Sequence, residues 1–344
     1  MDVALVGSYP PPHGGQSVHI FNLSNYLRAR GLKVGVFNTG LNKELREDTV
    51  INIASSKSLL TTLLLRSHFK LLHVHVTSAE DFGKLIPVRL AATVKRFPWF
   101  VTIHSGGSVN QMRKASSLRR RMSHALLAPA QNIICVNDVI RDELSTLVGP
   151  ETVVVIPPFS LEFCSSPLSM EVEDFFACHA PTISCVGLYE PAYGFDQAVR
   201  MLARIHEAYP AAGLLLIGEL KNAEWCRSLI KDLRLENHVK LCGNLGQQEC
   251  LSVMNRSALF LRPTLYDGDS ISVREALALG VPVVASKTDF RPDGVSCYRI
   301  GAFEDLVSRT LDSLRTASKV AARSVSHHVH LEQVRRLYLS VMQS

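Results

Sequence analysis

The stretch Arg262-Pro-Thr-Leu-Tyr-Asp267-Gly-Asp269-Ser-Ile-Ser272-Val-Arg274-Glu275-Ala-Leu-Ala-Leu-Gly280-Val-Pro-Val-Val-Ala-Ser286 predicts a strand, a polar loop, a short helix and a second strand. An apolar run, residues 257–261, enters it, and residues 281–285 leave it as a buried β-strand. Gly280 is placed to end the helix. The helix therefore starts at the carboxyl end of a strand, where open α/β sheets bind ligands, and its free N–H groups can hold an anion.

The carboxylate of Glu275 has two interpretations. Ser272-Val-Arg-Glu275 fits a capping box, with Ser272 as N-cap and Glu275 bonded back to the N–H of the cap. That interpretation leaves the cluster Asp267-Gly-Asp269-Ser270 unexplained. A glycine-containing loop lets backbone approach a ligand, and a carboxylate offers two acceptor oxygens to a sugar or ribose diol. The sequence leaves both interpretations open.

Two more loops follow predicted strands in the first half of the chain. Residues 7–15, Gly-Ser-Tyr-Pro-Pro-Pro-His-Gly-Gly, precede a helix, and Gly14 and Gly15 let N–H groups approach a phosphate or sugar. The alternative is a turn that ends a rigid proline loop. His104 follows another strand, in Thr-Ile-His104-Ser-Gly-Gly. A single histidine is more often structural, but its place at a strand end favours a ligand site.

Residues 262–286 resemble the signature of the family 4 glycosyltransferases: a carboxylate, seven residues, a glutamate, an Ala-rich helix, Gly and a Pro-Val-Val strand. The strand, Pro-Pro-x-Gly-Gly loop and amphipathic helix over residues 3–31 resemble the same family. It comprises retaining enzymes of the GT-B fold. The resemblance implies that Asp267, in place of the commoner Glu, contacts the donor sugar and that Glu275 binds the ribose of the nucleotide. It implies that His104 lies beside the donor sugar.

The largest departure from the family pattern is at residues 186–194. Relatives carry an Arg and a Lys that hold the diphosphate, whereas this chain has Leu188 and Tyr193. Two lost hydrogen bonds to a charged group cost about 3–6 kcal/mol, so we expect nearby arginines to replace them, with Tyr193 still able to donate. The residues expected to bind the donor are Gly14, Gly15, Tyr193, Arg262, Asp269, Ser270, Ser272, Arg274, Glu275 and Arg291, and those expected to be catalytic are His104 and Asp267.

The strand and helix pattern predicts an α/β protein with two Rossmann-like domains facing a central cleft, the GT-B plan. Pro157-Pro158 interrupts the pattern. We expect an N-terminal acceptor-side domain (1–160), an irregular linker (161–180), a C-terminal nucleotide-sugar-binding domain (181–328) and a terminal helix (329–344). The family resemblance implies that this helix packs back on the N-terminal domain.

Composition excludes several classes of protein. The 344 residues are 47% hydrophobic and 20% charged, which favours filled cores over disorder. None of the eight cysteines forms a C-x-x-C pair, so we expect no zinc or redox site but free thiols in a reducing cytosol. We expect neither a secretory leader nor a membrane span, because no apolar run reaches 18 residues. His73 and His75 alternate in one strand and favour packing over metal binding.

A basic cluster, Arg113, Lys114, Arg119, Arg120 and Arg121, falls in a predicted helix that runs to about Leu127. It has two interpretations: a solvated helix face, or a surface for anionic lipid or acceptor, because Met112, Leu118 and Met122 lie among the cations. The net charge of +6 suits an anionic ligand or membrane surface. No aromatic residues or reading module accompany the charge, which disfavours nucleic acid.

The expected function is transfer of a sugar from a nucleoside diphosphate sugar to a glycan or lipid-linked acceptor, with retention at the anomeric carbon. The resemblance implies no metal or other cofactor and a place in bacterial polysaccharide assembly. We expect a cytoplasmic protein, or one that is peripheral on the inner face of the membrane. The alternatives are a non-catalytic GT-B subunit that binds a glycan or nucleotide, and a sugar-nucleotide epimerase.

Overall fold

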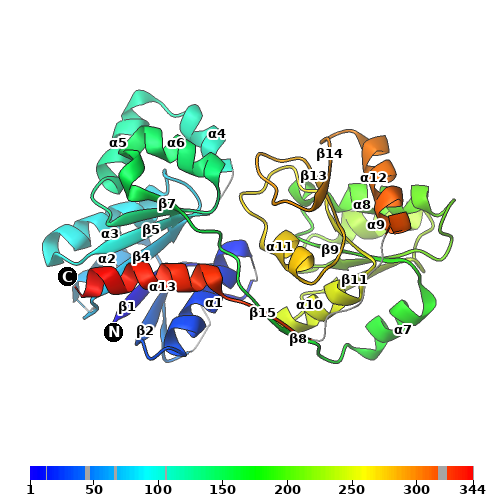
Figure 1. Ribbon diagram of the computed structural model, residues 1–344, viewed down its shortest axis with the longest axis horizontal. Helices are drawn as coiled ribbons and strands as arrows, with labels where there is room; N and C mark the ends of the chain where they lie inside the picture. The colour runs from blue at the N-terminus through cyan, green and yellow to red at the C-terminus, as the bar shows by residue number, and fades with distance from the viewer. Residues whose placement is uncertain (13, 43–46, 66–67, 105–106, 317–323, 344) are drawn as a thin grey trace. The chain divides into compact units, whose positions relative to one another are not determined.

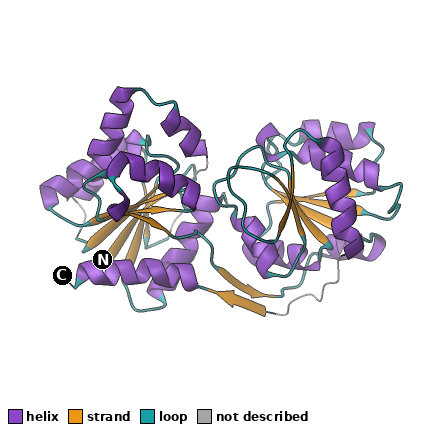
Figure 2. Cartoon of the chain, turned by 45° about the horizontal axis from the view of Figure 1, so that its top comes forward, coloured by secondary structure: helices purple, strands orange, loops and turns teal. Residues whose placement is uncertain are grey.

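The structure, a computed structural model, describes residues 1–12, 14–42, 47–65, 68–104, 107–316 and 324–343. The chain forms two units. Unit 1 comprises Met1–Ser160 and His328–Ser344, and unit 2 comprises Leu161–His327. Each unit has a parallel sheet covered by helices on both faces (Figures 1 and 2). The predicted pair of doubly wound α/β units is confirmed.

The sheet of unit 1 has the strand order β3-β2-β1-β4-β5-β6-β7. Its central strands are short apolar runs buried on both faces, as parallel sheets require. The elements are β1 (Val3–Gly7), α1 (Gly15–Arg28), β2 (Val34–Asn38), β3 (Val50–Asn52), α2 (Ser56–Leu65), β4 (Leu71–Val76), α3 (Phe82–Lys95), β5 (Trp99–Ile103), α4 (Gly107–Arg113), α5 (Ser117–Leu127), β6 (Asn132–Cys135), α6 (Asp138–Val148), η1 (Pro150–Thr152), β7 (Val153–Val155) and α13 (Val329–Met342).

The main sheet of unit 2 repeats this topology in the order β11-β10-β9-β12-β13-β14. Its elements, with those of a small second sheet, are β8 (Leu161–Cys164), α7 (Met170–Cys178), β9 (Thr182–Val186), η2 (Pro191–Tyr193), α8 (Phe195–Ile205), β10 (Gly213–Ile217), α9 (Glu224–Asp232), β11 (Val239–Gly243), α10 (Gln247–Arg256), β12 (Leu259–Arg262), α11 (Ile271–Ala278), β13 (Val283–Ser286), β14 (Val295–Tyr298), α12 (Phe303–Thr316) and β15 (Ser324–His327).

The expectation of an irregular linker over 161–180 is wrong. The segment forms β8 and α7, and β8 pairs antiparallel with β15, with His327 opposite Leu161. In β8, Leu161 and Phe163 are buried while the residues between and after them are exposed, which is the alternation of a half-buried strand. Four residues are too few to predict a strand, and the partner strand lies about 160 residues further along the chain.

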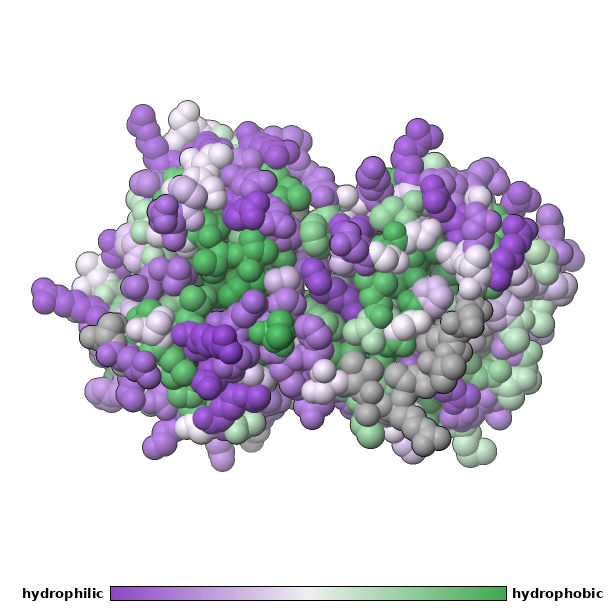
Figure 3. Space-filling model, viewed as in Figure 1, coloured by the Kyte–Doolittle hydropathy of each residue, from purple (hydrophilic) through white to green (hydrophobic). Residues whose placement is uncertain are grey.

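Alternate residues of β1 enter two different cores. Ala4 and Val6 pack on one face of the sheet, and Val3 and Leu5 on the other. The second core is completed by α13, whose residues Leu331, Val334 and Tyr338 are buried in it. The end of the chain is therefore part of unit 1. In the view of Figure 3, the hydrophobic residues of unit 1 that reach the surface gather between α6 and α13.

All eight cysteines are free thiols. Cys135, Cys185 and Cys226 are buried, whereas Cys164 and Cys178 are exposed. Burial raises the pKa of the Cys135 and Cys185 thiols to about 12, so both stay protonated. In the part of the chain that the structure describes, no helix is both long and apolar enough to cross a membrane.

Candidate functional site

The stretch 262–286 lies where the strand order of unit 2 reverses. After β9 the chain adds β10 and β11 on one side, and then returns to add β12 and β13 on the other. The loops that follow β9 and β12 therefore separate at their carboxyl ends, which opens a crevice for a ligand in sheets of this type. Arg262 ends β12 and Ser286 ends β13, so both side chains lie at this edge.

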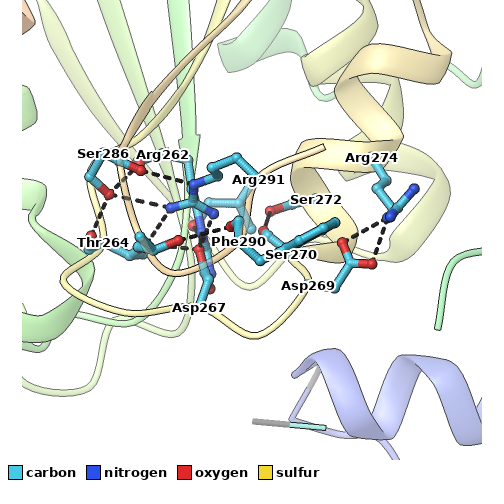
Figure 4. Close-up of polar contacts among 12 residues, drawn as sticks. Arg262, Thr264, Asp267, Asp269, Ser270, Ser272, Arg274, Ser286, Phe290 and Arg291 are labelled. Carbon is cyan, nitrogen blue, oxygen red and sulfur yellow. Dashed lines mark hydrogen bonds and ion pairs between the residues drawn. The ribbon is translucent and has the colours of Figure 1, made fainter. Parts of the chain in front are cut away.

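Asp267 is held by two arginines (Figure 4). The guanidinium of Arg262 donates from Nη2 to Oδ1 at 2.8 Å and from Nε to Oδ2 at 3.1 Å. Arg291 donates from Nη1 to Oδ2 at 2.7 Å, and the Thr264 hydroxyl donates to the same oxygen at 2.8 Å. Of these four hydrogen bonds from described residues, three go to Oδ2 and one to Oδ1, so Oδ1 keeps more acceptor capacity for a ligand.

Electrostatics keep Asp267 ionised. Burial raises the pKa of its carboxyl, but the guanidiniums of Arg262 and Arg291 outweigh burial and hold that pKa well below its ordinary value. Arg262 is anchored further, because its Nη1 donates to the carbonyl of Val186 at 2.8 Å. The Arg291 side chain is only 5% exposed. Neither guanidinium is a free surface cation, and both are fixed to one carboxylate.

Asp269 and Arg274 form a second pair. Nε of Arg274 lies 2.7 and 2.8 Å from the two carboxylate oxygens of Asp269. The sequence predicts direct donor binding by Asp269, whereas the structure leaves its side chain 0% exposed and that of Arg274 20% exposed. Asp269 therefore positions Arg274 (Figure 4). The Arg274 side chain is more exposed than those of Arg262 and Arg291.

The predicted capping box is absent. Helix α11 begins at Ile271 with Ser270 as N-cap, so Ser272 lies inside its first turn and Glu275 is the fifth helical residue. The Ser270 side chain makes no capping hydrogen bond, and its hydroxyl lies 3.2 Å from that of Ser272. Glu275 is buried. Burial raises the pKa of its carboxyl to about 7, although a hydrogen bond with Gln247 favours the ionised form. Helix capping therefore does not explain this glutamate.

Tyr193 stands where the family resemblance implies a cation. Its ring lies against Gly187, where an added Cβ would approach the ring to 2.6 Å. The guanidinium carbon of Arg262 lies 5.4 Å from the ring centroid, within range of a cation–π contact. The next residue, Gly194, has φ +68° and approaches the carbonyl of Pro263 too closely for a Cβ. Tyr193 therefore links the loop after β9 to Arg262.

The candidate residues of unit 1 meet at the carboxyl ends of β1, β4 and β5. Gly14 is the N-cap of α1, and Gly15 is its exposed first residue, where a Cβ would meet no atom within 4 Å. The fold thus does not require glycine at 15. His104 follows β5, is half-buried, and its ring centroid lies 5.4 Å from that of His19 on α1. Residues His13, Ser105 and Gly106 lie outside the described residues.

The basic cluster does not form one continuous helix. Arg113 ends α4, Lys114 lies in the turn after it, and the other three arginines lie on α5, whose N-cap is Ser116. Acidic residues distant in sequence neutralise three of its five cations: Arg113 and Arg120 pair with Glu143, and Arg119 pairs with Glu80. Of the cluster, Lys114 and Arg121 are exposed and make no ion pair with any described residue. The interpretation of this cluster as a surface for anionic lipid or acceptor, so far as it rests on charge alone, is therefore weakened.

The sequence did not single out several residues of these sites. Thr264 bonds the Asp267 side chain and Ser286 bonds that of Arg291. The signal available in the sequence was position: Ser286 ends β13, and Thr264 follows the end of β12 by two residues. Gln247 bonds Glu275 from the first position of α10, which no local pattern indicates. The sequence also did not predict that His75 contacts His104, whose Nε2 lies 3.1 Å from Nδ1 of His75.

Comparisons with known proteins agree with this architecture. The family model described as "Glycosyltransferase Family 4" matches residues 13–159, and "Glycosyl transferases group 1" matches residues 177–305. A phosphatidylinositol N-acetylglucosaminyltransferase subunit of Homo sapiens is 22% identical over an alignment of 317 residues, which covers 85% of this chain and 63% of that protein. The GDP-mannose-dependent alpha-(1-6)-phosphatidylinositol monomannoside mannosyltransferase of Mycobacterium tuberculosis is 28% identical over 148 residues, 41% of this chain and 37% of that protein.

Among solved structures, Anabaena Alr3699/HepE in complex with UDP and glucose superposes with a TM-score of 0.72 at 16% identity, over 99% of this chain and 100% of that one. At this identity the likeness shows the fold alone. The expected GT-B fold is thereby confirmed.

Proposed function

This chain belongs to the family 4 glycosyltransferases, and on that premise we propose that it moves a sugar from a nucleoside diphosphate sugar to a lipid-linked acceptor with retention at the anomeric carbon. The observation that carries the proposal is the set of side chains at the reversal point of the unit 2 sheet. Arg274, Ser272 and the buried Glu275 lie together at the start of α11.

The charge of this set suits a diphosphate. Three arginines (Arg262, Arg274 and Arg291) face two aspartates (Asp267 and Asp269), and burial raises the pKa of the Glu275 carboxyl to about 7. The positive excess lies beside the first turn of α11, whose N–H groups carry a partial positive charge. Such an arrangement stabilises a departing diphosphate without a metal ion.

Arg274 is the proposed replacement for the cation missing at position 188 or 193. It is the most exposed of the three arginines, whereas Arg262 and Arg291 support the loop through Asp267. Arg274→Gln should weaken nucleoside diphosphate binding roughly 10- to 100-fold, the effect of one hydrogen bond to a charged group. Calorimetric titration of UDP and GDP measures this, with the exposed Arg227→Gln of unit 2 as control. Unchanged affinity for both nucleotides would exclude the role.

Glu275 is proposed to bind the ribose diol. Its carboxyl is buried, bonded to Gln247 and not used as a cap. Glu275→Ala should weaken binding of the nucleoside diphosphate but not of inorganic diphosphate, because the ribose is absent from the latter. Equal losses for both ligands would point to disruption of the loop and not to a lost ribose contact.

Turnover is tested with a panel of radiolabelled nucleotide sugars, with and without membrane extract. Transfer of label to extract, with the anomeric configuration of the product read by NMR, tests both the activity and the retention of configuration. Loss of nucleotide sugar without an acceptor would indicate an epimerase. Binding without turnover would favour a non-catalytic member, for which Leu188, Tyr193 and the pairing of all three arginines with aspartates are the supporting observations.

A lipid acceptor is supported by relatives named for phosphatidylinositol substrates and by an apolar surface on unit 1. Ile86, Leu90 and Val94 recur every four residues along α3 and are 39%, 49% and 70% exposed. Helix α5, which packs against α3, adds Leu118 at 69% exposure. Apolar side chains with nearby cations are typical of helices that lie on an anionic membrane. We propose that these two helices dock on such a surface.

Cosedimentation with anionic vesicles tests the docking. The double variant Val94→Glu/Leu118→Glu should bind at least tenfold less than the unmodified protein, because carboxylates on this surface disfavour both insertion and charge attraction. Met170→Glu, at an equally exposed apolar position in unit 2, is the control. Equal sedimentation of all three proteins would exclude α3 and α5 as the docking surface.

A further inference from the structure

Four histidines are packed together inside unit 1. His73 and His75 lie on β4, His104 follows β5, and His19 lies on α1. The rings of His19, His75 and His104 are mutual neighbours, with centroids 5.3–5.4 Å apart, and the ring centroid of His73 lies 4.1 Å from that of His75, with the two rings tilted by 32°. We call these four residues the histidine cluster. Among the described residues, no group of His, Cys, Asp or Glu side chains is placed to hold a metal ion.

Two members of the cluster are anchored to the surrounding fold. Nδ1 of His19 lies 2.9 Å from the carbonyl oxygen of Pro158, which can only accept, so His19 carries its hydrogen on Nδ1. His73 bonds the Tyr338 hydroxyl through Nδ1 and the Thr102 hydroxyl through Nε2, the latter at 2.7 Å. These contacts fix the rings against which His75 and His104 pack.

The remaining two rings share one hydrogen. Nδ1 of His75 lies 3.1 Å from Nε2 of His104, so one of these nitrogens donates to the other. Burial lowers the pKa of both side chains well below the ordinary value, and neighbouring histidines lower it further, so both rings are neutral. A neutral imidazole has one N–H and one bare nitrogen. The position of the shared hydrogen therefore decides which nitrogen of His104 is protonated.

Either His104 donates to His75 or His75 donates to His104, and the second ring nitrogen of His75 decides between these two arrangements. Nε2 of His75 is buried and has no hydrogen-bond partner among the residues that the structure describes. If His104 donated, this nitrogen would carry a buried N–H without an acceptor, the rarer and costlier kind of orphan group. If His75 donates from Nδ1, its Nε2 is bare and only an acceptor is unused. The second arrangement places the hydrogen of His104 on Nδ1. His104 is half-buried and its Nδ1 is not among the buried unpartnered atoms of the described residues, whereas Nε2 of His75 is, so an N–H costs less on Nδ1 of His104.

We infer that His75 is a positioning residue: it donates from Nδ1 to Nε2 of His104 and holds His104 in the tautomer that carries its hydrogen on Nδ1. His104 then offers a hydrogen-bond donor, which suits a sugar hydroxyl or a phosphate oxygen, and does not act as a base. The role of His104 beside the donor sugar rests on the proposed function. The tautomer itself does not, because it is set in the protein without ligand.

The tautomer is measured by NMR on protein labelled with ¹⁵N-histidine, where the ring nitrogens with and without hydrogen are distinguished by chemical shift. His104→Gln assigns the signals. In the unmodified protein, Nδ1 of His104 should carry the hydrogen. His75→Leu removes the donor and should move the hydrogen to Nε2 in most molecules. His75→Asn should preserve the original tautomer, because the asparagine amide can occupy the position of Nδ1 and donate from it.

His73→Leu is the control for packing, because it removes a ring of the cluster that does not bond His104. Its His104 tautomer should remain unchanged. A hydrogen on Nε2 of His104 in the unmodified protein would overturn the inference. So would an unchanged tautomer in a folded His75→Leu variant. If that variant does not fold, the comparison of His75→Asn with His75→Gln decides. Glutamine places its amide nearer the Nε2 position, so His104 should no longer be held with its hydrogen on Nδ1.

Kinetics supply an independent readout. With the nucleotide sugar that the protein uses, His75→Leu should lower kcat roughly 10- to 100-fold while changing KM less than about threefold, as expected when an oriented group is released. His75→Asn should retain kcat within about threefold. If the unmodified protein turns over no nucleotide sugar, the proposed function fails, and the NMR measurement still decides the inference about His75.

Discussion

Replacing Glu275 by glutamine should make unit 2 more stable, and the gain should grow with pH. The carboxyl is buried at the start of α11, bonded to Gln247, and no described residue forms an ion pair with it. Burial raises its pKa from 4.5 to about 7. The folded protein thus favours the protonated acid, and ionising Glu275 above that pKa costs folding free energy that the unfolded chain does not lose.

The magnitude follows from linkage. A group whose folded pKa is raised loses stability as pH rises from its unfolded pKa through its folded pKa. With pKa values of 4.5 and about 7, the destabilisation by Glu275 is about 1 kcal/mol at pH 5 and about 3 kcal/mol at pH 8. Glutamine does not ionise. The stability difference between Glu275→Gln and the unmodified protein should therefore increase by about 2 kcal/mol between these two pH values.

Urea unfolding at pH 5 and pH 8 measures this difference. The chain has two tryptophans, Trp99 in unit 1 and Trp225 in unit 2. In a Trp99→Phe background, fluorescence reports unit 2 alone, which avoids treating a two-unit protein as one transition. Glu236→Gln, at an exposed position of unit 2, is the matched control and should show no such growth. A difference that stays constant within about 0.5 kcal/mol would refute the reasoning, because the carboxyl would then not be buried in water-free surroundings.

Four other substitutions test how much individual contacts contribute to the stability of each unit. Arg291→Gln leaves the largely buried carboxylate of Asp267 with one of its two guanidiniums and should destabilise unit 2 by about 3 kcal/mol, measured by Trp225 fluorescence in urea. Tyr338→Phe removes a hydroxyl bonded inside unit 1 and should cost about 1 kcal/mol, measured by circular dichroism. Gly194→Ala forces a Cβ onto a carbonyl oxygen and should lower the melting temperature, whereas Gly15→Ala should leave it unchanged.

Much of the architecture follows from local sequence, because buried parallel strands are short apolar runs and their helices lie between them. The segment 262–286 illustrates this: β12, α11 and β13 lie in it in the predicted order. Prediction from the sequence failed where two segments or residues that contact each other lie far apart along the chain. The pairing of β8 with β15 has no local signature, and neither does the hydrogen bond of Gln247 with Glu275.

The chemistry of the site was less predictable than its location. Asp267 and the arginines were identified, but no local pattern indicated that Arg262 and Arg291 bind the same carboxylate, because a loop determines which side chains meet. The capping box failed for a similar reason. The helix begins one residue before Ser272, and the hydroxyls of Ser270 and Ser272 face each other. Whether these residues bind the donor stays a prediction.

The contribution of α13 to unit 1 has a consequence for synthesis on the ribosome. Unit 2 is one continuous segment, Leu161–His327, whereas unit 1 needs residues from both sides of it. At roughly 5–20 residues per second, translating the intervening segment takes roughly 10–30 s. During that interval the apolar residues of unit 1 that pack against Leu331, Val334 and Tyr338 have been synthesised but are not yet covered by α13. Unit 2 can finish folding first, and a chaperone that binds apolar surface would meet the nascent chain at these residues.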